Sequence, residues 1–484
     1  MSALNRINHV VVLMLENRSF DNMLGKLYPK SPGFDGLDGT ETNLDANGNA
    51  VRVWNRPGTD EITMNIPDPD PGELWTDMNT QIFGIPMPPL PPAAMSGFVK
   101  SYLTQTVEPP ASYKPESVMH YFMPEQVPVI SRLARQFAVC DRWHASAPCQ
   151  TWPNRFFVHT GTANGYENNS PSHFPYQMPT IFNRFEDLDI AGGWRIYFHD
   201  VPQTLTLARL WPHLDGFRFY EEFQHDARTG NLPSYAFIEP RYFADVALPN
   251  DQHPPHVVTL GEQLIADVYN RLRNGPAWAE TLLVITYDEH GGCYDHVAPP
   301  KAVPPGMPAT SPFNFDRYGV RVPAVIVSPF IPQGTVLRPP GETPFDHTSI
   351  MATLRKRFSL GAPLSNRDAA APDLETVLSL ANPDNPGPEH IEPLPFVPSP
   401  GDVAKAQAIP LNNMQEALVD LAAILPQERG NADFAAFVAR HAADIGADGG
   451  AAFRAAMAAR NANTDVGSAI AAIKTNLGNF FRNL

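Results

Sequence analysis

The sequence predicts an α/β protein in which helices cover a mostly parallel sheet. Three apolar runs have the pattern of strands that are buried on both faces; they are HVVVLML (9–15), LLVITY (282–287) and PAVIVS (323–328). Apolar residues between Leu260 and Leu272 recur at helical spacing shortly before the second run. A helix followed by a strand is typical of parallel sheets with covering helices, so this order supports the fold class.

The first apolar run is expected to be a core strand rather than a signal sequence. No small-residue cleavage site follows it, and the chain continues directly into the polar residues ENRSFD (16–21). We therefore expect no export signal and a cytoplasmic protein, whereas a leader that had been removed would make it secreted or periplasmic. No apolar run reaches the ~18 residues that a transmembrane helix needs.

A long Pro-rich insertion is predicted at residues 26–98, within a catalytic domain that we expect to span residues 1–380. Asn47-Gly48 is typical of a β-hairpin turn inside this insertion. Its apolar segment IPMPPLPPAAM (85–95) is expected either to act as a lid or lipid-contacting loop or to pack across the core. Loops of this length are usually functional or disordered.

The remaining segments complete the predicted organisation. Residues 124–137 have an apolar face at helical spacing, and residues 137–140 fit a short strand. The Pro-rich residues 381–402 are expected to be a linker, and the Ala-rich residues 403–484 a helical C-terminal region. Two helices are expected there, with apolar faces formed by Leu418, Leu421, Ala422 and Leu425 in one and by Phe434, Phe437, Val438 and His441 in the next.

Composition and missing motifs exclude several functional classes. The 35 Lys and Arg against 51 Asp and Glu give a net charge of −16, which disfavours nucleic acid as a partner because phosphate contacts need Lys and Arg. The three cysteines, Cys140, Cys149 and Cys293, are too few for a disulfide scaffold. The chain lacks GxGxxG, Walker A, HExxH and GxSxG patterns, the usual marks of dinucleotide, P-loop, zincin and α/β-hydrolase enzymes.

Two acidic clusters directly follow predicted strands, and ligands of parallel α/β sheets gather at the carboxyl ends of strands. Glu16 and Asn17 offer a carboxylate and an amide oxygen, which suit a hard divalent cation; Asn17 could instead be a helix N-cap. Asp288 and Glu289 are costly to bury unless they bind a metal or accept hydrogen bonds, and a solvated surface turn is the alternative. Gly291-Gly292 would allow a tight turn and a close backbone approach.

Thr151 is a candidate nucleophile in the segment SAPCQTWPNR (146–155). A threonine hydroxyl is weakly nucleophilic until a metal or a base lowers its pKa, and composition alone favours an ordinary turn residue. His253 and His256 form a pair flanked by prolines on what must be a loop. A histidine there could protonate a leaving group near neutral pH.

These residues and their surroundings resemble a known family. The motifs are HVVVLMLENRSFDNMLG, SPGFDGLDG, FAVCDRWHASAPCQTWPNRFFVHTGT, LPNDQHPPH, ITYDEHGGCYDHVAPP, FDRYGVRVPAVIVSPFI and FDHTSIMATLRKRF, within residues 6–380. They resemble the phosphoesterase family of bacterial phosphatidylcholine-hydrolysing phospholipases C, acid phosphatase A and plant non-specific phospholipases C. The segments EPRYF and DEHGG are most similar to the plant branch.

The resemblance implies an alkaline-phosphatase-like α/β fold and roles for individual residues. Thr151 would be the metal-bound nucleophile, and Asn154 belongs to the PNR motif beside it. His253 and His256 fall where the family has histidines near the leaving group. The implied metal ligands are Glu16, Asn17, Thr151, Asp288 and Glu289. Acid phosphatase A has two aspartates at the last pair, so the choice among Ca, Mg, Mn and Zn stays open.

The residues and the resemblance together predict a metal-dependent phosphodiesterase of the phospholipase C type. It would cleave glycerophospholipids to diacylglycerol and a phosphorylated head group through a phosphothreonine intermediate. The alternatives are an acid-phosphatase-type phosphomonoesterase and a non-catalytic, metal-stabilised binding protein. The expected partner is a phospholipid or another phosphate ester, with transient membrane-surface contact; the net charge of −16 disfavours anionic membranes. The sequence leaves the oligomeric state open.

Overall fold

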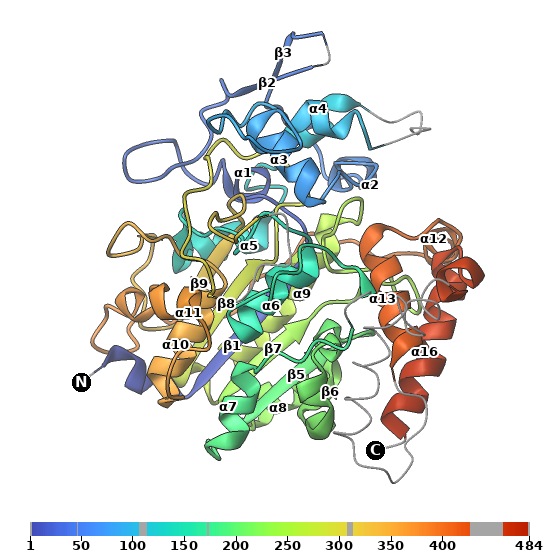
Figure 1. Ribbon diagram of the computed structural model, residues 1–484. Coiled ribbons are helices and arrows are strands. Elements are labelled where there is room, and N and C mark those ends of the chain that lie inside the picture. Colours follow the sequence, from blue (N-terminus) through green and yellow to red (C-terminus); the bar gives the residue numbers. More distant parts are fainter. Residues whose placement is uncertain are drawn as a thin grey trace.

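The centre of the protein is an eight-stranded sheet in the order β10-β4-β9-β8-β1-β7-β5-β6 (Figure 1). The computed structural model describes residues 2–45, 47–105, 114–171, 174–306, 313–425 and 458–482. The strands of the sheet are β1 (His9–Leu15), β4 (Ala138–Cys140), β5 (Trp194–Phe198), β6 (Phe217–Phe219), β7 (Tyr235–Glu239), β8 (Thr281–Tyr287), β9 (Ala324–Val327) and β10 (Thr335–Leu337).

The apolar run 9–15 forms β1, one of the two central strands of the sheet. It pairs in parallel with β8 through all seven of its residues, from His9 with Thr281 to Leu15 with Tyr287, and with β7 on its other side. Six of its residues are buried, as expected for a strand that is covered on both faces. The predicted α/β class with a mostly parallel sheet is confirmed.

The third apolar run forms β9, which runs antiparallel to both of its neighbours, β8 and β4. The chain that leaves β8 remains at the carboxyl end of the sheet, where Tyr294 bonds to Val118 and Arg321 to Asp295. It therefore enters β9 from that end, and a strand entered from there must run in the opposite direction. Nothing in the apolar run itself indicates this reversal.

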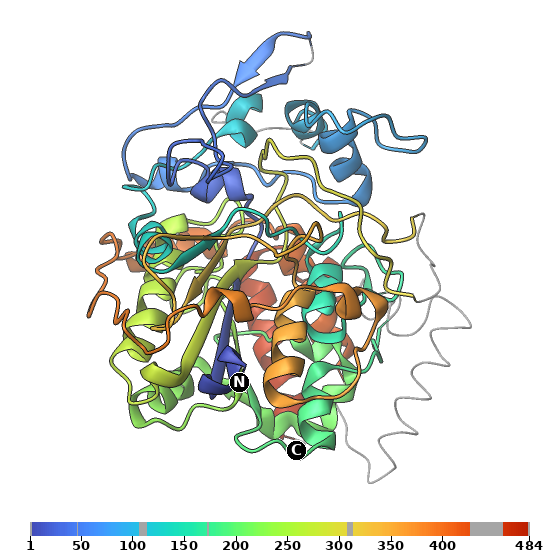
Figure 2. The same ribbon diagram turned by 90° about the vertical axis from the view of Figure 1, so that its left-hand side faces the viewer.

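Helices cover both faces of the sheet (Figure 2). On one face α5, α8 and α9 pack together, and on the other α6, α7, α10 and α11. The predicted amphipathic helix and the helix expected at residues 124–137 are α9 and α5. The bounds are α5 (Pro128–Gln136), α6 (Thr151–Thr160), α7 (Ile181–Asp187), α8 (Tyr220–Thr229), α9 (Val258–Arg273), α10 (Thr348–Phe358) and α11 (Asn366–Ala370).

The Pro-rich insertion lies over the carboxyl ends of the strands, at the top of Figure 1. The expected Asn47-Gly48 hairpin is present, with Leu44 paired to Ala50. The segment also contains short helices, so it is less irregular than its composition suggests. The elements here and next to it are α1 (Phe20–Leu24), β2 (Thr42–Leu44), β3 (Ala50–Arg52), α2 (Glu61–Met64), α3 (Trp75–Phe83) and α4 (Phe98–Tyr102).

The C-terminal helices pack against the β6 side of the sheet (Figure 1). The Phe481 ring lies 6.0 Å from that of Phe198 in β5 and 6.4 Å from that of Phe217 in β6. The helix expected around Phe434–His441 lies outside the described residues. The helices are α12 (Pro400–Gln407), α13 (Asn413–Ile424) and α16 (Val466–Arg482).

The Pro-rich residues 381–402 are packed along α9. Asn270 accepts a hydrogen bond from the backbone of Ile391 and donates one back to its carbonyl, and Tyr269 donates one to Pro388. In the part of the chain that the structure describes, no helix is both long and apolar enough to cross a membrane.

A buried carboxylate joins two helices of the sheet's covering layer. Glu262 of α9 is fully buried and accepts hydrogen bonds from the backbone N–H groups of Val129 (2.6 Å) and Ile130 (3.2 Å), in the first turn of α5. This caps the N-terminus of α5. Because burial disfavours the charged form, it raises the pKa of Glu262 to about 8.

Glu262→Gln is therefore expected to change how stability depends on pH. Between the ordinary pKa of 4.5 and about 8, the unfolded chain loses the Glu262 proton while the folded protein retains it. Stability of the wild type then falls with rising pH by about 1.4 kcal/mol per unit from this group, and glutamine removes that slope. Urea unfolding should show that the free energy of unfolding of the variant, relative to that of the wild type, rises between pH 5 and pH 8. The exposed Glu125→Gln is the control; parallel profiles for wild type and Glu262→Gln would contradict the account.

Candidate active site

The two acidic clusters meet because β1 and β8 are parallel neighbours in register. Leu15 pairs with Tyr287, so the next residues along each strand leave the sheet side by side. The backbone N–H of Asn17 donates to Asp288 Oδ1 at 3.0 Å, and that of Asp288 donates to the Leu15 carbonyl. Glu16, Asn17, Asp288 and Glu289 are all fully buried, so the solvated-turn alternative is wrong.

The amide of Asn17 has a fixed orientation. Its Nδ2 donates to Glu73 Oε1 (2.5 Å) and to Glu289 Oε1 (2.7 Å). Because both amide hydrogens are held by carboxylates, Oδ1 faces the opposite side, toward Thr151. Asn17 has φ 51°, in the left-handed region that asparagine tolerates better than most residues. It is not a helix N-cap; Ser19 caps α1 by accepting from the Asn22 N–H.

Gly291 permits the close approach of the two clusters. It has φ +58°, and a Cβ added there would lie 2.2 Å from the Asn17 carbonyl oxygen. Gly292 also has a positive φ, of 61°. The tight turn and close backbone approach predicted for this pair of glycines are confirmed.

Thr151 is the first residue of α6 and is fully buried. Its hydroxyl Oγ1 lies 3.3 Å from Glu16 Oε2 and 3.4 Å from Asn17 Oδ1. Residues that are more than 130 positions apart in the chain thus bring a hydroxyl, a carboxylate and an amide oxygen to one point. An ordinary exposed turn threonine does not fit this position.

Asn154 shapes the loop that leads into Thr151. Its Oδ1 accepts from the Ala147 N–H at 3.0 Å, and its Nδ2 donates to the carbonyls of Ala147, Cys149 and Gln150. The side-chain amide is therefore fully used in holding the turn before α6. This geometry fits a residue that positions Thr151.

Two residues that the sequence analysis does not single out hold Glu16. Arg155, one turn along α6 from Thr151, pairs with Glu16 Oε1 at 2.5 Å and lies 3.9 Å from Asp288 Oδ2. Gln203 donates to the same Glu16 oxygen at 2.8 Å. Arg155 belongs to the quoted PNR motif, so its spacing from Thr151 on a helix could have indicated it; Gln203 gives no signal in the sequence.

His347 supports the backbone at Asp288. Trp143 Nε1 donates to His347 Nδ1 at 3.3 Å, so Nε2 carries the proton and donates to the Asp288 carbonyl at 2.6 Å. The residue stands at the start of α10 but makes no side-chain cap.

The carboxylates of this region are buried close together, and their charges are only partly balanced. Burial raises the pKa of Glu16 well above its ordinary value, and Arg155 opposes this rise. Burial and the neighbouring Asp288 likewise raise the pKa of Glu289, and burial and Glu289 raise that of Glu73. Asp288 Oδ2 is buried without a hydrogen-bond partner. Such a group of acids favours bound positive charge.

The donors present fit a hard divalent cation. Glu16 Oε2, Asn17 Oδ1, Thr151 Oγ1 and Asp288 Oδ2 are all oxygens, the ligand type that Ca²⁺, Mg²⁺ and Mn²⁺ prefer. Both carboxylate oxygens of Glu289 already accept hydrogen bonds, Oε1 from Asn17 and Oε2 from the Gly291 N–H at 2.8 Å. The oxygens of Glu289 retain further lone pairs.

The two predicted histidines differ in their surroundings. His253 is fully buried; its Nδ1 bonds to the Pro254 carbonyl at 2.6 Å, and its Nε2 lies 3.4 Å from Glu73 Oε1. Burial lowers the pKa of His253 to about 3. His256 is 10% exposed at its side chain, and its Nδ1 bonds to Asp251 Oδ1 at 2.7 Å. The two rings lie 6.1 Å apart. His256 is the one nearer the protein surface.

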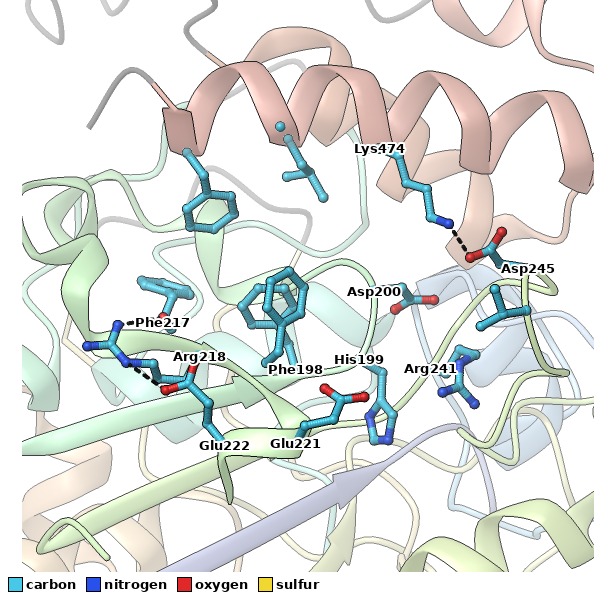
Figure 3. Close-up of a pocket in the computed structure, with 15 residues that line it drawn as sticks. Phe198, His199, Asp200, Phe217, Arg218, Glu221, Glu222, Arg241, Asp245 and Lys474 are labelled. Carbon is cyan, nitrogen blue, oxygen red and sulfur yellow. Dashed lines mark hydrogen bonds and ion pairs between the residues drawn. The ribbon is translucent and has the colours of Figure 1, made fainter. Parts of the chain in front are cut away.

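A cavity of about 730 Å³ lies elsewhere, between α16 and the ends of β5 and β6 (Figure 3). Its lining includes Phe198, Phe217 and Phe481, and Arg218 and Lys474 are among the charged residues that line it. None of the predicted site residues lines it.

The chain is similar in sequence to known proteins. The sequence profile of the Phosphoesterase family matches residues 7–361. The chain is 37% identical to non-specific phospholipase C3 of Arabidopsis thaliana, over 88% of this chain and 83% of that protein, and 40% identical to non-specific phospholipase C1 of the same plant (81% and 74%). Phospholipase C A of Mycobacterium tuberculosis (strain ATCC 25618 / H37Rv) is 28% identical over 79% of each chain.

Among solved structures, a protein in the alkaline phosphatase superfamily from Vibrio parahaemolyticus matches with a TM-score of 0.31, at 12% identity over 51% of this chain and 64% of that one. The sequence matches alone carry the assignment. They cover the acidic clusters after β1 and β8 and the threonine between them, and on that basis the chain belongs to the phosphoesterase family.

Proposed function

We propose that the protein is a metal-dependent phosphodiesterase of the phospholipase C type, with Thr151 as its nucleophile. The position of the Thr151 hydroxyl, 3.3 Å from Glu16 and 3.4 Å from Asn17, is the observation that carries the proposal. The relatives named non-specific phospholipase C, at 37–40% identity over most of the chain, support the substrate class.

Thr151 would attack phosphorus as its hydroxyl proton passes to Glu16 Oε2, 3.3 Å away, while the bond to the departing alcohol breaks. A divalent cation bound by Glu16, Asn17, Thr151, Asp288 and Glu289 would supply a lowered hydroxyl pKa and neutralise charge on the phosphoryl oxygens. Thr151 stands at the N-terminus of α6, where the helix dipole also favours an anion. Water would then cleave the phosphothreonine. A glycerophospholipid would give diacylglycerol and a phosphorylated head group.

His256 is the better candidate for protonating the departing alcohol. Its Nδ1 bonds to Asp251, which orients the ring and leaves Nε2 to carry the proton that is transferred. His253, by contrast, is fully buried and its lowered pKa keeps it neutral. Asp251 also ties this loop to β1, because its carbonyl accepts from the Glu16 N–H at 2.9 Å.

The segment 85–95 has exposed apolar side chains that suit contact with lipid. Ile85 is 36% and Met87 52% exposed, so these apolar side chains are not packed across the core. The segment belongs to the insertion that lies over the carboxyl ends of the strands (Figure 1). We propose that it meets the lipid surface when substrate enters.

Thr151→Ala is expected to abolish hydrolysis of p-nitrophenyl phosphorylcholine, because no other hydroxyl would replace the nucleophile. Thr151→Ser should retain part of the rate. Chelation should remove wild-type activity, and added divalent metal should restore it. The measurement is initial rate for each variant, with circular dichroism to verify that the fold is intact.

The same assay separates the alternatives. Faster cleavage of p-nitrophenyl phosphate than of the diester would identify a phosphomonoesterase instead. Metal-loaded protein that cleaves neither ester nor phosphatidylcholine would overturn the enzymatic proposal in favour of a binding role.

Gly291→Ala should reduce activity by ~100-fold or more, because its Cβ would displace the Asn17 backbone and a displacement of ~1 Å can cost that much. Gly193→Ala is the matched control: its φ is +53°, and nothing lies within 4 Å of the added Cβ. Both alanines should cost ~1–2 kcal/mol of stability from their left-handed backbone, measured by thermal unfolding. Equal activity in the two variants would show that the approach of Gly291 to Asn17 is not needed.

His256→Asn should slow the hydrolysis of phosphatidylcholine by ~10²–10⁴-fold, the usual contribution of a general acid. The p-nitrophenyl ester should be affected much less, since p-nitrophenolate departs without a proton. The ratio of the two rates, compared between wild type and variant, checks this. A uniform loss on both substrates would rule out the proposed proton transfer.

A further inference from the structure

A second group of possible metal ligands lies beside the first. Side-chain atoms of Asp70, Glu73 and His253 all lie within 4.8 Å of one another. Asp70 and Glu73 come from the insertion, and His253 comes from the loop after β7. Glu73 touches the first site through its hydrogen bond from Asn17, but none of the three belongs to the ligand set proposed there.

Several atoms of this group are buried and have no hydrogen-bond partner. They are both carboxylate oxygens of Asp70, Glu73 Oε2 and His253 Nε2. Glu73 is 1% and His253 0% exposed. Buried polar atoms are rarely left unpaired, because each costs free energy.

The hydrogen bonds of His253 leave a lone pair aimed at Glu73. Its Nδ1 bonds to the Pro254 carbonyl, which can only accept, so Nδ1 carries the proton. Nε2 is then an acceptor, and it lies 3.4 Å from Glu73 Oε1. A lone pair facing a carboxylate is repulsive unless a metal ion or a proton lies between them. A carbonyl that holds the other nitrogen is a common arrangement for metal-binding histidine.

No lysine or arginine of the described residues forms an ion pair with Asp70 or Glu73 within 4.0 Å. The nearby Arg18 instead donates to the carbonyls of Gln252 and Ile66.

Another group of two carboxylates and one histidine differs in this respect. In Asp21, Asp295 and His296, Arg321 donates to both carboxylates at 3.0 Å and balances their charge. The two groups thus resemble each other in ligand atoms but not in their need for a cation.

We propose that Asp70, Glu73 and His253 Nε2 form a second divalent-cation site, which ties the insertion to the sheet beside Asn17. One imidazole with two carboxylates suits Mn²⁺ or Zn²⁺ better than Ca²⁺. The site is an inference about metal binding and does not depend on the hydrolytic reaction proposed above.

Mn²⁺ bound per chain, measured by equilibrium dialysis and elemental analysis of the full-length protein, tests the site. The wild type is expected to bind two ions, and Glu73→Gln and Asp70→Asn one each. Glu16→Gln should lose the other ion. His296→Asn, in the group balanced by Arg321, is the matched control and should retain both.

These five proteins distinguish this inference from the proposed function. A single wild-type ion that Glu73→Gln and Asp70→Asn lose but Glu16→Gln retains would support the second site and contradict the first. The second site would be overturned by a single wild-type ion that only Glu16→Gln loses, by two ions retained in both insertion variants, or by a wild type that binds two ions when Glu73→Gln binds none. Circular dichroism identifies a variant that fails to fold, and the other insertion variant then decides.

Discussion

Four carboxylates, those of Glu16, Glu73, Asp288 and Glu289, are buried together at the carboxyl ends of β1 and β8, and the surrounding structure is arranged around their charge. Arg155 balances Glu16, and Asn17 shares its two amide hydrogens between Glu73 and Glu289. The backbone N–H groups of Asn17 and Gly291 donate to Asp288 Oδ1 and Glu289 Oε2. Removing any one of these partners would leave a buried charge without compensation, which is among the most destabilising changes that a protein can undergo.

That constraint also explains why the insertion and the sheet belong to one site. Glu73 reaches Asn17 from the insertion. Gln81 Oε1 of α3 accepts from Nε2 of His290, the residue directly after Glu289, at 2.7 Å. The insertion therefore completes the polar surroundings of residues that the strands supply.

The sequence is sufficient to predict β1 and β8, because they are apolar runs that can only be buried, and the acidic residues that follow them. The sequence also predicts that Thr151 belongs with these acidic residues, but only through the motif around it. Composition favoured an ordinary turn threonine. The reversal of β9 could not be predicted, since antiparallel and parallel core strands have the same apolar pattern. Asp70 and Glu73 could not be predicted either, because they lie in a Pro-rich segment without periodicity. Their importance comes from contacts with His253 and Asn17, which are far away in the chain.

The central position of β1 has a consequence for how the chain is made. β1 comes from residues 9–15, yet its two partners are β7 (Tyr235–Glu239) and β8 (Thr281–Tyr287). At a ribosomal rate of ~5–20 residues per second, the second partner emerges roughly 15–50 s after β1. Until β7 emerges, an almost entirely apolar strand has neither neighbour, and it can pair with whatever strand it meets. Recombinant production should therefore benefit from chaperones that bind extended apolar segments during synthesis.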